Sequence, residues 1–400
     1  MSGANFLQDS TERINKPPEN GEYEVSVFGR GYGESIVLSC GNRDFIIVDS
    51  FINPDTGRPI ALDYLDSMSI QYDRIKQVII THWHDDHIRG ISEIIQEAGD
   101  SISIILNPIV KDKTFDKYIM KAISEGGDNG ASEIGKVFEY ISKHENSVKI
   151  SCVDKRVYAD EEKNSAELYG LAPQDSEIMD YINKHIIKNI SESVTAPYYK
   201  NDNELSLVLL LKKHRDGVLL GGDLENSNDD TRGWNAIVNN YTHTSTHPSL
   251  YKVPHHGSIT GYNENVWKKI LTKNPISVIT VFNKNKKLPS KEEILKIEGL
   301  SKKVYIVGAT QNDKELERKV EKSAPRVKVV SAKTLIGMYR YRKCMDSGKE
   351  TSEVFGHVVV RDGITENMQS KDEQIEVINE FFSGDAEGEC GALCNTSHLK

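Results

Sequence analysis

The sequence lacks the features that mark secreted, membrane-spanning or disulfide-stabilised proteins. Five cysteines, an odd number, are spread along 400 residues, so a disulfide framework is not expected. The densest apolar run, residues 205–211, is far shorter than the roughly 18 residues that a membrane helix needs. Residues 1–20 contain no basic segment followed by an apolar one, which argues against a signal peptide. We therefore expect a cytoplasmic protein with no membrane attachment.

An excess of positive charge is also absent. The 50 Lys and Arg residues are outnumbered by 60 Asp and Glu residues, and the formal net charge of −10 weighs against general affinity for nucleic acid. The acidity is concentrated, however, because residues 344–400 carry twelve acidic and four basic side chains. The first 343 residues have a net charge of about −2, so a phosphate-bearing substrate is not excluded for them.

Strand and helix patterns alternate at both ends of a predicted domain over residues 21–362. Between them, residues 111–193 contain amphipathic helical patterns and polar linkers, which predict a helical insertion. Residues 1–20 form a polar leader. Residues 363–400 form an acidic tail with one amphipathic helix expected over 372–382. The alternation predicts a layered α/β domain.

The segment VIITHWHDDHIRG gathers metal-binding side chains directly after a predicted strand. It places His82, His84, Asp86 and His87 within six residues. Neutral imidazole and carboxylate are good ligands for zinc and similar divalent ions. Residues two apart in an extended loop point the same way, so His82 and His84 can bind one ion. Asp86 and His87 follow on the far side of the turn, where they can bind a second ion.

The HxHxDH motif after an apolar strand resembles the signature of the metallo-β-lactamase fold, an αββα sandwich with a two-metal site at one edge. The resemblance extends over roughly residues 23–341. It implies that Asp49 buttresses the histidine loop, with a strand-end cap as its alternative role, and that Asp223 bridges the ions. VPHHGS resembles the motif of the last ligand. Because adjacent histidines do not easily aim at one point, we expect the two to have separate roles. His255 would bind metal. His256 would then bind substrate phosphate or donate a proton to the leaving group.

Four further segments, GRGYGESIVL, NELSLVLLL, KVPHHGS and NENVWKKI, resemble the hydrolase domain of the competence DNA-uptake protein ComEC and its stand-alone relatives. This similarity implies a nuclease-like or phosphodiesterase-like activity. Two departures are visible. ComEC is an integral membrane protein, and its domain commonly carries His-Pro where this chain has Leu288-Pro289.

One expected ligand is missing. The fold usually supplies a histidine before the strand that leads to the bridging aspartate, and YYKNDNELSLV contains none. Asp202 or Asn203 could coordinate through oxygen instead. An oxygen ligand would favour Mn or Mg over Zn at that position. We therefore expect two divalent ions, Zn or Mn, with Asn203 as a candidate ligand.

Two bound ions imply hydrolysis by an activated water, with Asp86 orienting the hydroxide. Ser258 could contact a phosphoryl oxygen, although it could equally cap the helix that follows. Seven basic residues and no acidic ones lie between Lys322 and Lys343, and tyrosines interleave with Arg340 there. This composition suits binding of a phosphate backbone with base stacking. Alternatively, the tyrosines face the core and the arginines face solvent. Lys284, Lys286 and Lys287 form a second basic cluster.

Three hypotheses for the function remain open. The first is a metal-dependent phosphodiesterase or nuclease that acts on nucleic acid or a nucleotide. The second is a metallohydrolase of a non-phosphate ester, thioester or amide. The third is an effector subunit of a larger bacterial defence or toxin assembly, with a protein partner bound through the helical insertion or the tail. The acidic tail could also fold back on the body as a mimic of a polyanion.

Overall fold

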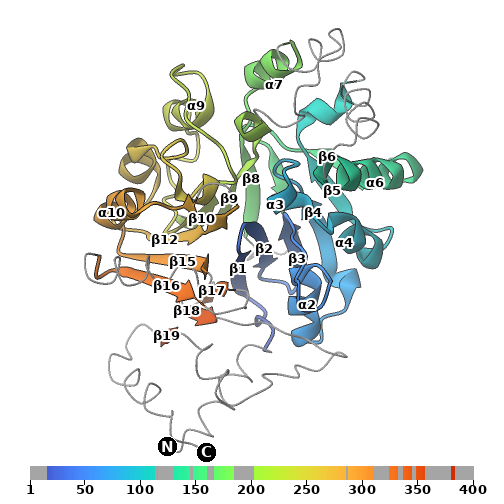
Figure 1. The fold of residues 1–400 in the computed structure, drawn as a ribbon, viewed down its shortest axis with the longest axis horizontal. Helices are drawn as coiled ribbons and strands as arrows, with labels where there is room; N and C mark the ends of the chain where they lie inside the picture. The colour runs from blue at the N-terminus through green and yellow to red at the C-terminus, as the bar shows by residue number, and fades with distance from the viewer. Residues whose placement is uncertain are drawn as a thin grey trace, which may run out of the picture.

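Two β-sheets lie face to face at the centre of the molecule (Figure 1). The computed structural model describes residues 16–112, 115, 129–144, 147–159, 166–183, 202–284, 287–309, 324–331, 337–344, 348–355 and 380–382. Within these residues the first sheet has nine strands and the second has eight.

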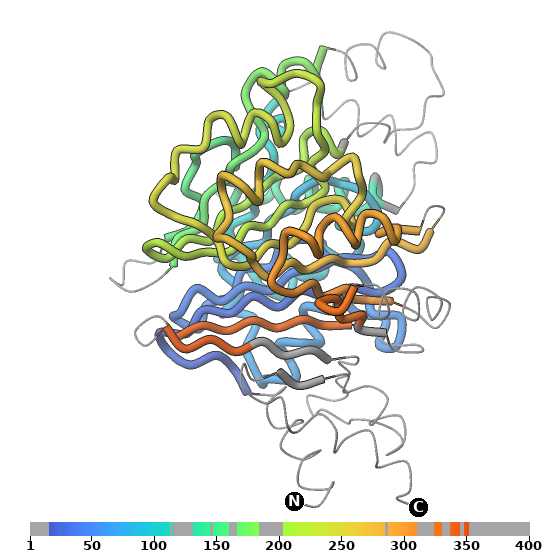
Figure 2. The backbone as a smooth tube through the Cα atoms, turned by 90° about the vertical axis from the view of Figure 1, so that its left-hand side faces the viewer, coloured from blue at the N-terminus to red at the C-terminus, as the bar shows by residue number. Residues whose placement is uncertain are grey.

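The first sheet runs in the order β19-β18-β17-β1-β2-β3-β4-β5-β6. Its strands are β1 (Glu22–Arg30), β2 (Gly33–Cys40), β3 (Phe45–Val48), β4 (Ile75–Ile79), β5 (Ser103–Leu106), β6 (Val148–Ile150), β17 (Gly337–Cys344), β18 (Glu350–Phe355) and β19 (Glu380–Phe382). Figure 2 shows the orange-red strand β17 beside the blue strands from the start of the chain. The sheet is antiparallel around β1 and parallel from β3 to β6.

The second sheet runs in the order β16-β15-β12-β11-β10-β9-β8-β7. Its strands are β7 (Arg156–Tyr158), β8 (Glu167–Ala172), β9 (Val208–Lys213), β10 (Asp216–Leu220), β11 (Leu250–Lys252), β12 (Ile276–Thr280), β15 (Lys303–Ala309) and β16 (Val327–Ser331). A separate two-stranded ribbon pairs β13 (Phe282–Asn283) with β14 (Lys287–Leu288). As expected, β9 and β10 form a hairpin.

Helices cover the outer face of each sheet. Beside the first sheet lie α2 (Ile60–Ser67), α3 (Asp85–Ile88), α4 (Ile91–Ala98) and α6 (Asn129–Lys143). Beside the second sheet lie α9 (Gly233–Asn239), the π-helical turn η7 (Val266–Ile270) and α10 (Lys291–Leu300). In α10, Ser290 and Glu293 form a capping box that fixes the first turn. The helix α7 (Asp175–Tyr181) and the 3-10 turns η1 (Tyr72–Arg74), η2 (Pro108–Lys111), η5 (Asp202–Leu205) and η6 (His255–Gly257) complete the described elements.

Three apolar layers explain the arrangement. The middle layer joins the facing sides of the two sheets and includes Val25, Leu38 and Val48 from the first and Leu209, Leu220 and Val278 from the second. The outer layers seat the helices on the far side of each sheet. Full burial of one such side chain stabilises the fold by about 1.5–3 kcal/mol. The order helix, sheet, sheet, helix confirms the predicted αββα sandwich.

The stretch of about residues 111–193, predicted as a helical insertion, contains strands as well as helices among its described residues. The expected helices are present in part, as α6 and α7. The same stretch also contributes β6 to the first sheet and β7 and β8 to the second. These strands extend both sheets, so the described parts of this stretch that form them belong to the sandwich.

The acidic tail lies largely outside the described residues, as do residues 1–15 of the leader. Its three described residues, Glu380–Phe382, form the strand β19 on the edge of the first sheet beside β18. The helix predicted over 372–382 therefore does not extend to its last three residues. No helix among the described residues is long and apolar enough to cross a membrane.

The loops that carry the predicted ligands leave the carboxyl ends of four strands. Asp49 follows β3 and the histidine motif follows β4, and these two strands are parallel neighbours. Asp223 follows β10 and the pair His255-His256 follows β11, which are parallel neighbours in the other sheet. Carboxyl ends of parallel neighbours share one edge, so each sheet presents its ligand loops together.

Candidate metal centre

The histidine-rich loop begins where β4 ends and continues into the short helix α3. His82 lies in the loop, and Asp86 and His87 lie on the helix. His82 Nε2 and His84 Nδ1 are 3.1 Å apart, so the two rings converge as their spacing predicts. Burial and the neighbouring His87 and His84 lower the pKa of His82 well below its ordinary value. The His82 ring is therefore neutral, the form that binds a metal ion.

Asp49 holds this loop from the end of β3. Its carboxylate accepts hydrogen bonds from Thr81 N at 2.8 Å and from Thr81 Oγ1 at 2.6 Å. Its Oδ2 also lies 2.8 Å from His87 Nδ1. Because Asp49 engages Nδ1, the Nε2 of His87 is directed at Asp86 and Asp223. This is the buttressing contact expected from the sequence.

Asp223 lies on the turn that follows β10, between the imidazoles of His87 and His256. Its Oδ1 is 3.4 Å from His87 Nε2, and its Oδ2 is 3.7 Å from His256 Nε2. Burial raises the pKa of Asp223, but the charges of His87 and His256 outweigh burial and hold it well below the ordinary range. Gly222 has a φ of 51°, and a Cβ there would lie 2.5 Å from Ser206 Oγ. That hydroxyl accepts the Asp223 N–H, so glycine is needed to bring Asp223 into place.

His256 points into this cluster. Its Nε2 is 3.3 Å from Asp86 Oδ2, and its Nδ1 is 3.2 Å from both the carbonyl oxygen and the hydroxyl of Thr280. The side chain is only 1% exposed. His256, for which the sequence predicts a role in substrate binding or proton donation, therefore belongs to the group of side chains that could hold a metal ion.

His255 lies at the rim of the cluster. Its Nδ1 is 2.9 Å from both Glu225 Oε1 and Thr260 Oγ1, and Asn203 Nδ2 is 3.4 Å from its Nε2. Burial disfavours the charged ring, but the hydrogen bond with Glu225 and the charge of Asp223 raise the pKa of His255 above its ordinary value. His255 therefore faces a second acid, Glu225, which the sequence reasoning did not single out.

Asn203, the candidate for the missing histidine, lies on η5 next to this rim. Its amide nitrogen contacts His255 and, at 3.5 Å, Glu225. Its Oδ1 is buried and has no hydrogen-bond partner among the described residues. The side chain of Asp202, the other candidate, lies outside the described part of the chain. The geometry thus leaves an amide oxygen of Asn203 free for a cation.

The cluster fits divalent metal ions. Within the described residues, ligand atoms of Glu34, His87, Asp223 and His256 all lie within 4.8 Å of one another, as do those of Asp49, His82 and His87. His87 Nε2 and Asp223 Oδ1 are buried and have no hydrogen-bond partner in this part of the structure. A bound cation would satisfy both atoms. Asp223 and Asp86 raise the pKa of His87 despite its burial, and metal binding would release that proton.

A buried ion pair lies behind His256 and joins the two sheets. Glu34 on β2 pairs with Lys252 on β11, and both side chains are 1% exposed. Thr280 Oγ1 donates a hydrogen bond to the same Glu34 oxygen, which lies 4.0 Å from His256 Nδ1. Glu34 therefore supports His256 from the side away from Asp86. The sequence does carry a signal for two isolated buried charges, since Glu34 and Lys252 are each the one charged residue of their strand.

Ser258 does not face the cluster as an open hydroxyl. It is 1% exposed, and its Oγ is 3.1 Å from Thr260 Oγ1. The Ser258 N–H also bonds back to the carbonyl of His255. These contacts hold the turn after the two histidines and engage the hydroxyl for which the sequence predicts a role in substrate binding.

Arg340 is also buried, at 1% exposed, on β17. The cations of Arg342 and Arg340 outweigh the burial of Glu24 and lower the pKa of that carboxyl. Arg342 Nε donates to Glu24 at 2.6 Å, and Lys343 pairs with Asp216. These arginines neutralise a buried acid and do not present a surface for phosphate, which corrects the predicted role of Arg340 in substrate binding. The alternative expectation placed the tyrosines in the core and the arginines in solvent. Tyr339 and Tyr341 are indeed in the core, but Arg340 and Arg342 are buried as well.

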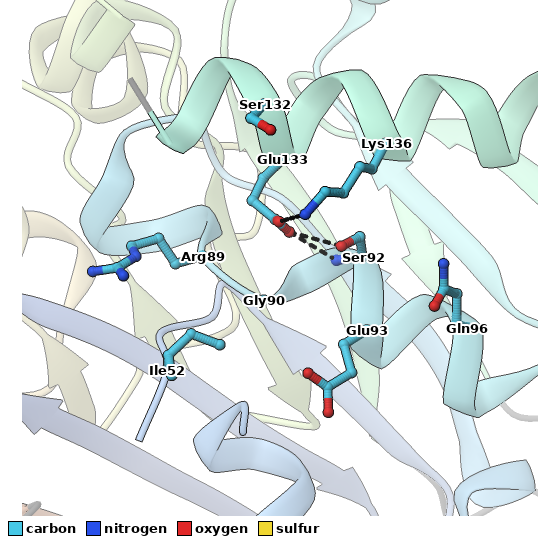
Figure 3. Close-up of a pocket in the computed structure, with 9 residues that line it drawn as sticks. All are labelled: Ile52, Arg89, Gly90, Ser92, Glu93, Gln96, Ser132, Glu133 and Lys136. Atoms are coloured by element: carbon cyan, nitrogen blue, oxygen red, sulfur yellow. Dashed lines mark hydrogen bonds and ion pairs between the residues drawn. The ribbon is translucent and has the colours of Figure 1, made fainter. Parts of the chain in front are cut away.

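A polar cavity of about 520 Å³ lies beside the centre, between α4 and α6 (Figure 3). Glu133 reaches from α6 to Ser92 at 2.8 Å and to Lys136 at 2.6 Å. Arg89, the second residue after His87, lines the cavity, but its guanidinium points away from Glu133. The cavity therefore adjoins the histidine helix without containing a predicted ligand.

Comparison with known proteins agrees with this architecture. Residues 29–127, which contain the histidine motif, match the Metallo-beta-lactamase superfamily. A 63-residue stretch is 33% identical to the Beta-lactamase-like protein 2 homolog of Caenorhabditis elegans. That stretch is 15% of this chain and 21% of the relative, so the chain matches only about a fifth of the relative's length.

Solved structures resemble the chain at low sequence identity. A diphosphatase from the PhnP family is 9% identical with a TM-score of 0.39, covering 81% of this chain and 98% of its own. The short form of human tRNase Z is 11% identical with a TM-score of 0.37, covering 78% of this chain and 98% of its own. The chain is thus similar to the Metallo-beta-lactamase superfamily over residues 29–127, and its described residues include a buried cluster able to bind metal.

Proposed function

We propose that the protein is a metal-dependent phosphodiesterase or nuclease related to the hydrolase domain of ComEC. The observation that carries the proposal is the position of Asp223 between His87 and His256, next to the converging pair His82 and His84. In this arrangement His82, His84, Asp86, His87, Asp223 and His256, with the amide oxygen of Asn203 at the edge of the cluster, would hold two divalent ions, Zn or Mn.

A bound pair of divalent ions would lower the pKa of a water molecule and neutralise charge on a phosphoryl oxygen. The chain's own residues then position and move protons. Asp86, ionised because the charge of His87 outweighs its burial, accepts a hydrogen bond from the attacking water. His255, which Glu225 orients and which is partly exposed at the edge of the cluster, would donate a proton to the leaving oxygen. This role passes to His255 because His256 lies inside the cluster.

A panel of substrates tests the proposal. Protein loaded with Mn or Zn is incubated with single-stranded DNA, RNA, bis-p-nitrophenyl phosphate and nitrocefin. We expect cleavage of the phosphodiesters, and loss of that cleavage in Asp86→Ala with the fold retained by circular dichroism. Cleavage of a non-phosphate ester or amide, with every phosphodiester intact, would overturn the proposal in favour of the second hypothesis. Unchanged turnover by Asp86→Ala would refute the site.

A further inference from the structure

Two aromatic rings extend from His256 towards the surface. The Phe282 ring centroid is 5.2 Å from that of His256, and the Tyr32 ring lies edge-on to Phe282 at 6.2 Å. Phe282 and Tyr32 are both partly exposed, whereas His256 is buried. The rings therefore lead from the proposed metal centre to solvent.

The main chain fixes these rings together although they are far apart in sequence. Tyr32 lies in the turn between β1 and β2, and Phe282 lies on β13. The N–H of Asn283 donates to the carbonyl of Gly31 at 2.8 Å, which ties β13 to that turn. The relative position of Tyr32 and Phe282 is therefore fixed by a backbone hydrogen bond as well as by the rotamers of the two side chains.

Two cations border the same surface. Lys284 Nζ lies 5.1 Å from the centre of the Tyr32 ring and 3.9 Å from Asp85 Oδ2, and its side chain is 48% exposed. Arg89 Nη1 donates a hydrogen bond to the Tyr32 hydroxyl at 3.1 Å. Lys284, the first residue of the second basic cluster in the sequence, therefore lies beside these rings. We name Tyr32, Phe282, Lys284 and Arg89 the aromatic rim.

Resting on the proposed function, we propose that the aromatic rim selects nucleoside phosphodiesters. Tyr32 and Phe282 stack a nucleobase next to the scissile phosphate, and Lys284 binds a neighbouring phosphate. Aromatic side chains bind bases of any sequence because every base has a π-face, and a flanking cation holds the backbone. A simple alkyl diester can place its phosphate at the metal centre, but it has no base to stack on the aromatic rim.

The test compares two substrates with the same leaving group. These are the p-nitrophenyl ester of thymidine 5′-monophosphate and methyl p-nitrophenyl phosphate. We expect kcat/KM to favour the thymidine ester by about tenfold or more, the range that stacking of one base provides. Phe282→Leu keeps an apolar side chain of similar size without the π-face, and it should reduce this preference about fivefold or more. Phe282→Trp should restore it.

Binding without turnover provides a second measurement. Fluorescence anisotropy compares labelled dT12 with an abasic strand of equal length, and thymidine 5′-monophosphate as a competitor separates a mononucleotide site from a strand-binding site. Phe282→Leu should weaken binding of dT12 but not of the abasic strand, whereas Lys284→Ala should weaken both. Lys268→Ala is the matched control, because Lys268 is exposed and pairs with Glu264 outside the rim.

The outcomes separate the two proposals. Cleavage of both esters with no preference in the wild type, or a preference untouched in Phe282→Leu, would overturn the aromatic rim while leaving the phosphodiesterase intact. Cleavage of neither ester would overturn the proposed activity. If, in addition, dT12 and the abasic strand bind with equal affinity, the proposal for the aromatic rim is overturned as well. Tighter binding of dT12 that is lost in Phe282→Leu would support it.

Discussion

His255 and His256 are neighbours in the chain, yet their rings lie in different surroundings. Both have left-handed backbone, with φ of 47° and 52°, and the ring centroids are 6.4 Å apart. Such backbone is strained for a non-glycine residue and persists where the surroundings enforce it. The residue types alone predict that the two rings diverge. Which ring turns inward depends on these φ angles and on Thr280, and neither can be inferred from VPHHGS.

Exchange of each histidine for alanine tests this division. His256→Ala should lower the affinity for Mn or Zn at least tenfold, because the ring lies against Asp86 and Asp223. His255→Ala should retain the metal and lower turnover instead. Equilibrium dialysis with elemental analysis measures metal content, and cleavage of single-stranded DNA, whose leaving alkoxide needs a proton, measures turnover. Metal loss in His255→Ala, with retention in His256→Ala, would show that the assignment is the reverse.

At the scale of elements, the pair Glu34–Lys252 connects β2 of one sheet with β11 of the other. Lys252→Met should destabilise the fold by about 3–5 kcal/mol, because it leaves a buried carboxylate without its cation. Glu34→Gln combined with Lys252→Met should recover much of the loss, since neither side chain of the pair then carries a charge. Urea denaturation with a chelator present measures the free energy of unfolding. Lys268→Met, at an exposed pair, is the control and should change it by less than about 1 kcal/mol. An equally small change in Lys252→Met would contradict the prediction.

The first turn of α2 carries a buried acid whose protonation affects stability. Burial raises the pKa of Asp63 to about 6, although hydrogen bonds from Thr56 and Asn53 oppose the rise. The folded protein therefore binds this proton more tightly than the unfolded chain. The stabilisation is complete below the ordinary pKa of 3.8 and is lost as the pH rises through about 6.

Asp63→Asn should consequently gain stability relative to the wild type as the pH rises. The expected relative gain is about 2–3 kcal/mol between about pH 4 and about pH 7. Urea denaturation at several pH values, with chelator present to remove the effect of metal binding, measures the difference. Parallel stability curves for the two proteins would contradict the raised pKa.

Much of the fold and part of the site could be predicted from local patterns. Strands and helices at both ends of the domain have clear periodicity, and the spacing of His82 and His84 fixes their convergence. The strands β6, β7 and β8 were missed because short strands between helical patterns gain their stability from neighbours in the sheet. The pairing of Glu34 with Lys252, and the burial of Arg340 beside Glu24, depend on contacts across strands distant in sequence. No local sequence pattern indicates which acidic side chain pairs with which basic one.

At the scale of the whole molecule, charge is divided between a near-neutral body and an acidic end. Residues 365–400 carry eight acidic and two basic side chains, so their removal changes the formal net charge from −10 to −4. Of these residues the structure describes only the strand β19, which pairs with β18 on the edge of the first sheet. If the substrate is a polyanion, as proposed, this acidic segment competes with it wherever the two reach the same surface.

Deletion of residues 365–400 should therefore raise the affinity for single-stranded DNA about threefold to tenfold at low salt. The gain should shrink as salt is added, because screening weakens repulsion by the tail. A full-length variant in which the eight acids become amides should reproduce the gain, and this separates charge from the loss of β19. Fluorescence anisotropy over a series of salt concentrations measures both effects. If the amide variant binds DNA as the wild type does while the truncated chain binds more tightly, the edge strand is responsible and electrostatic competition is refuted.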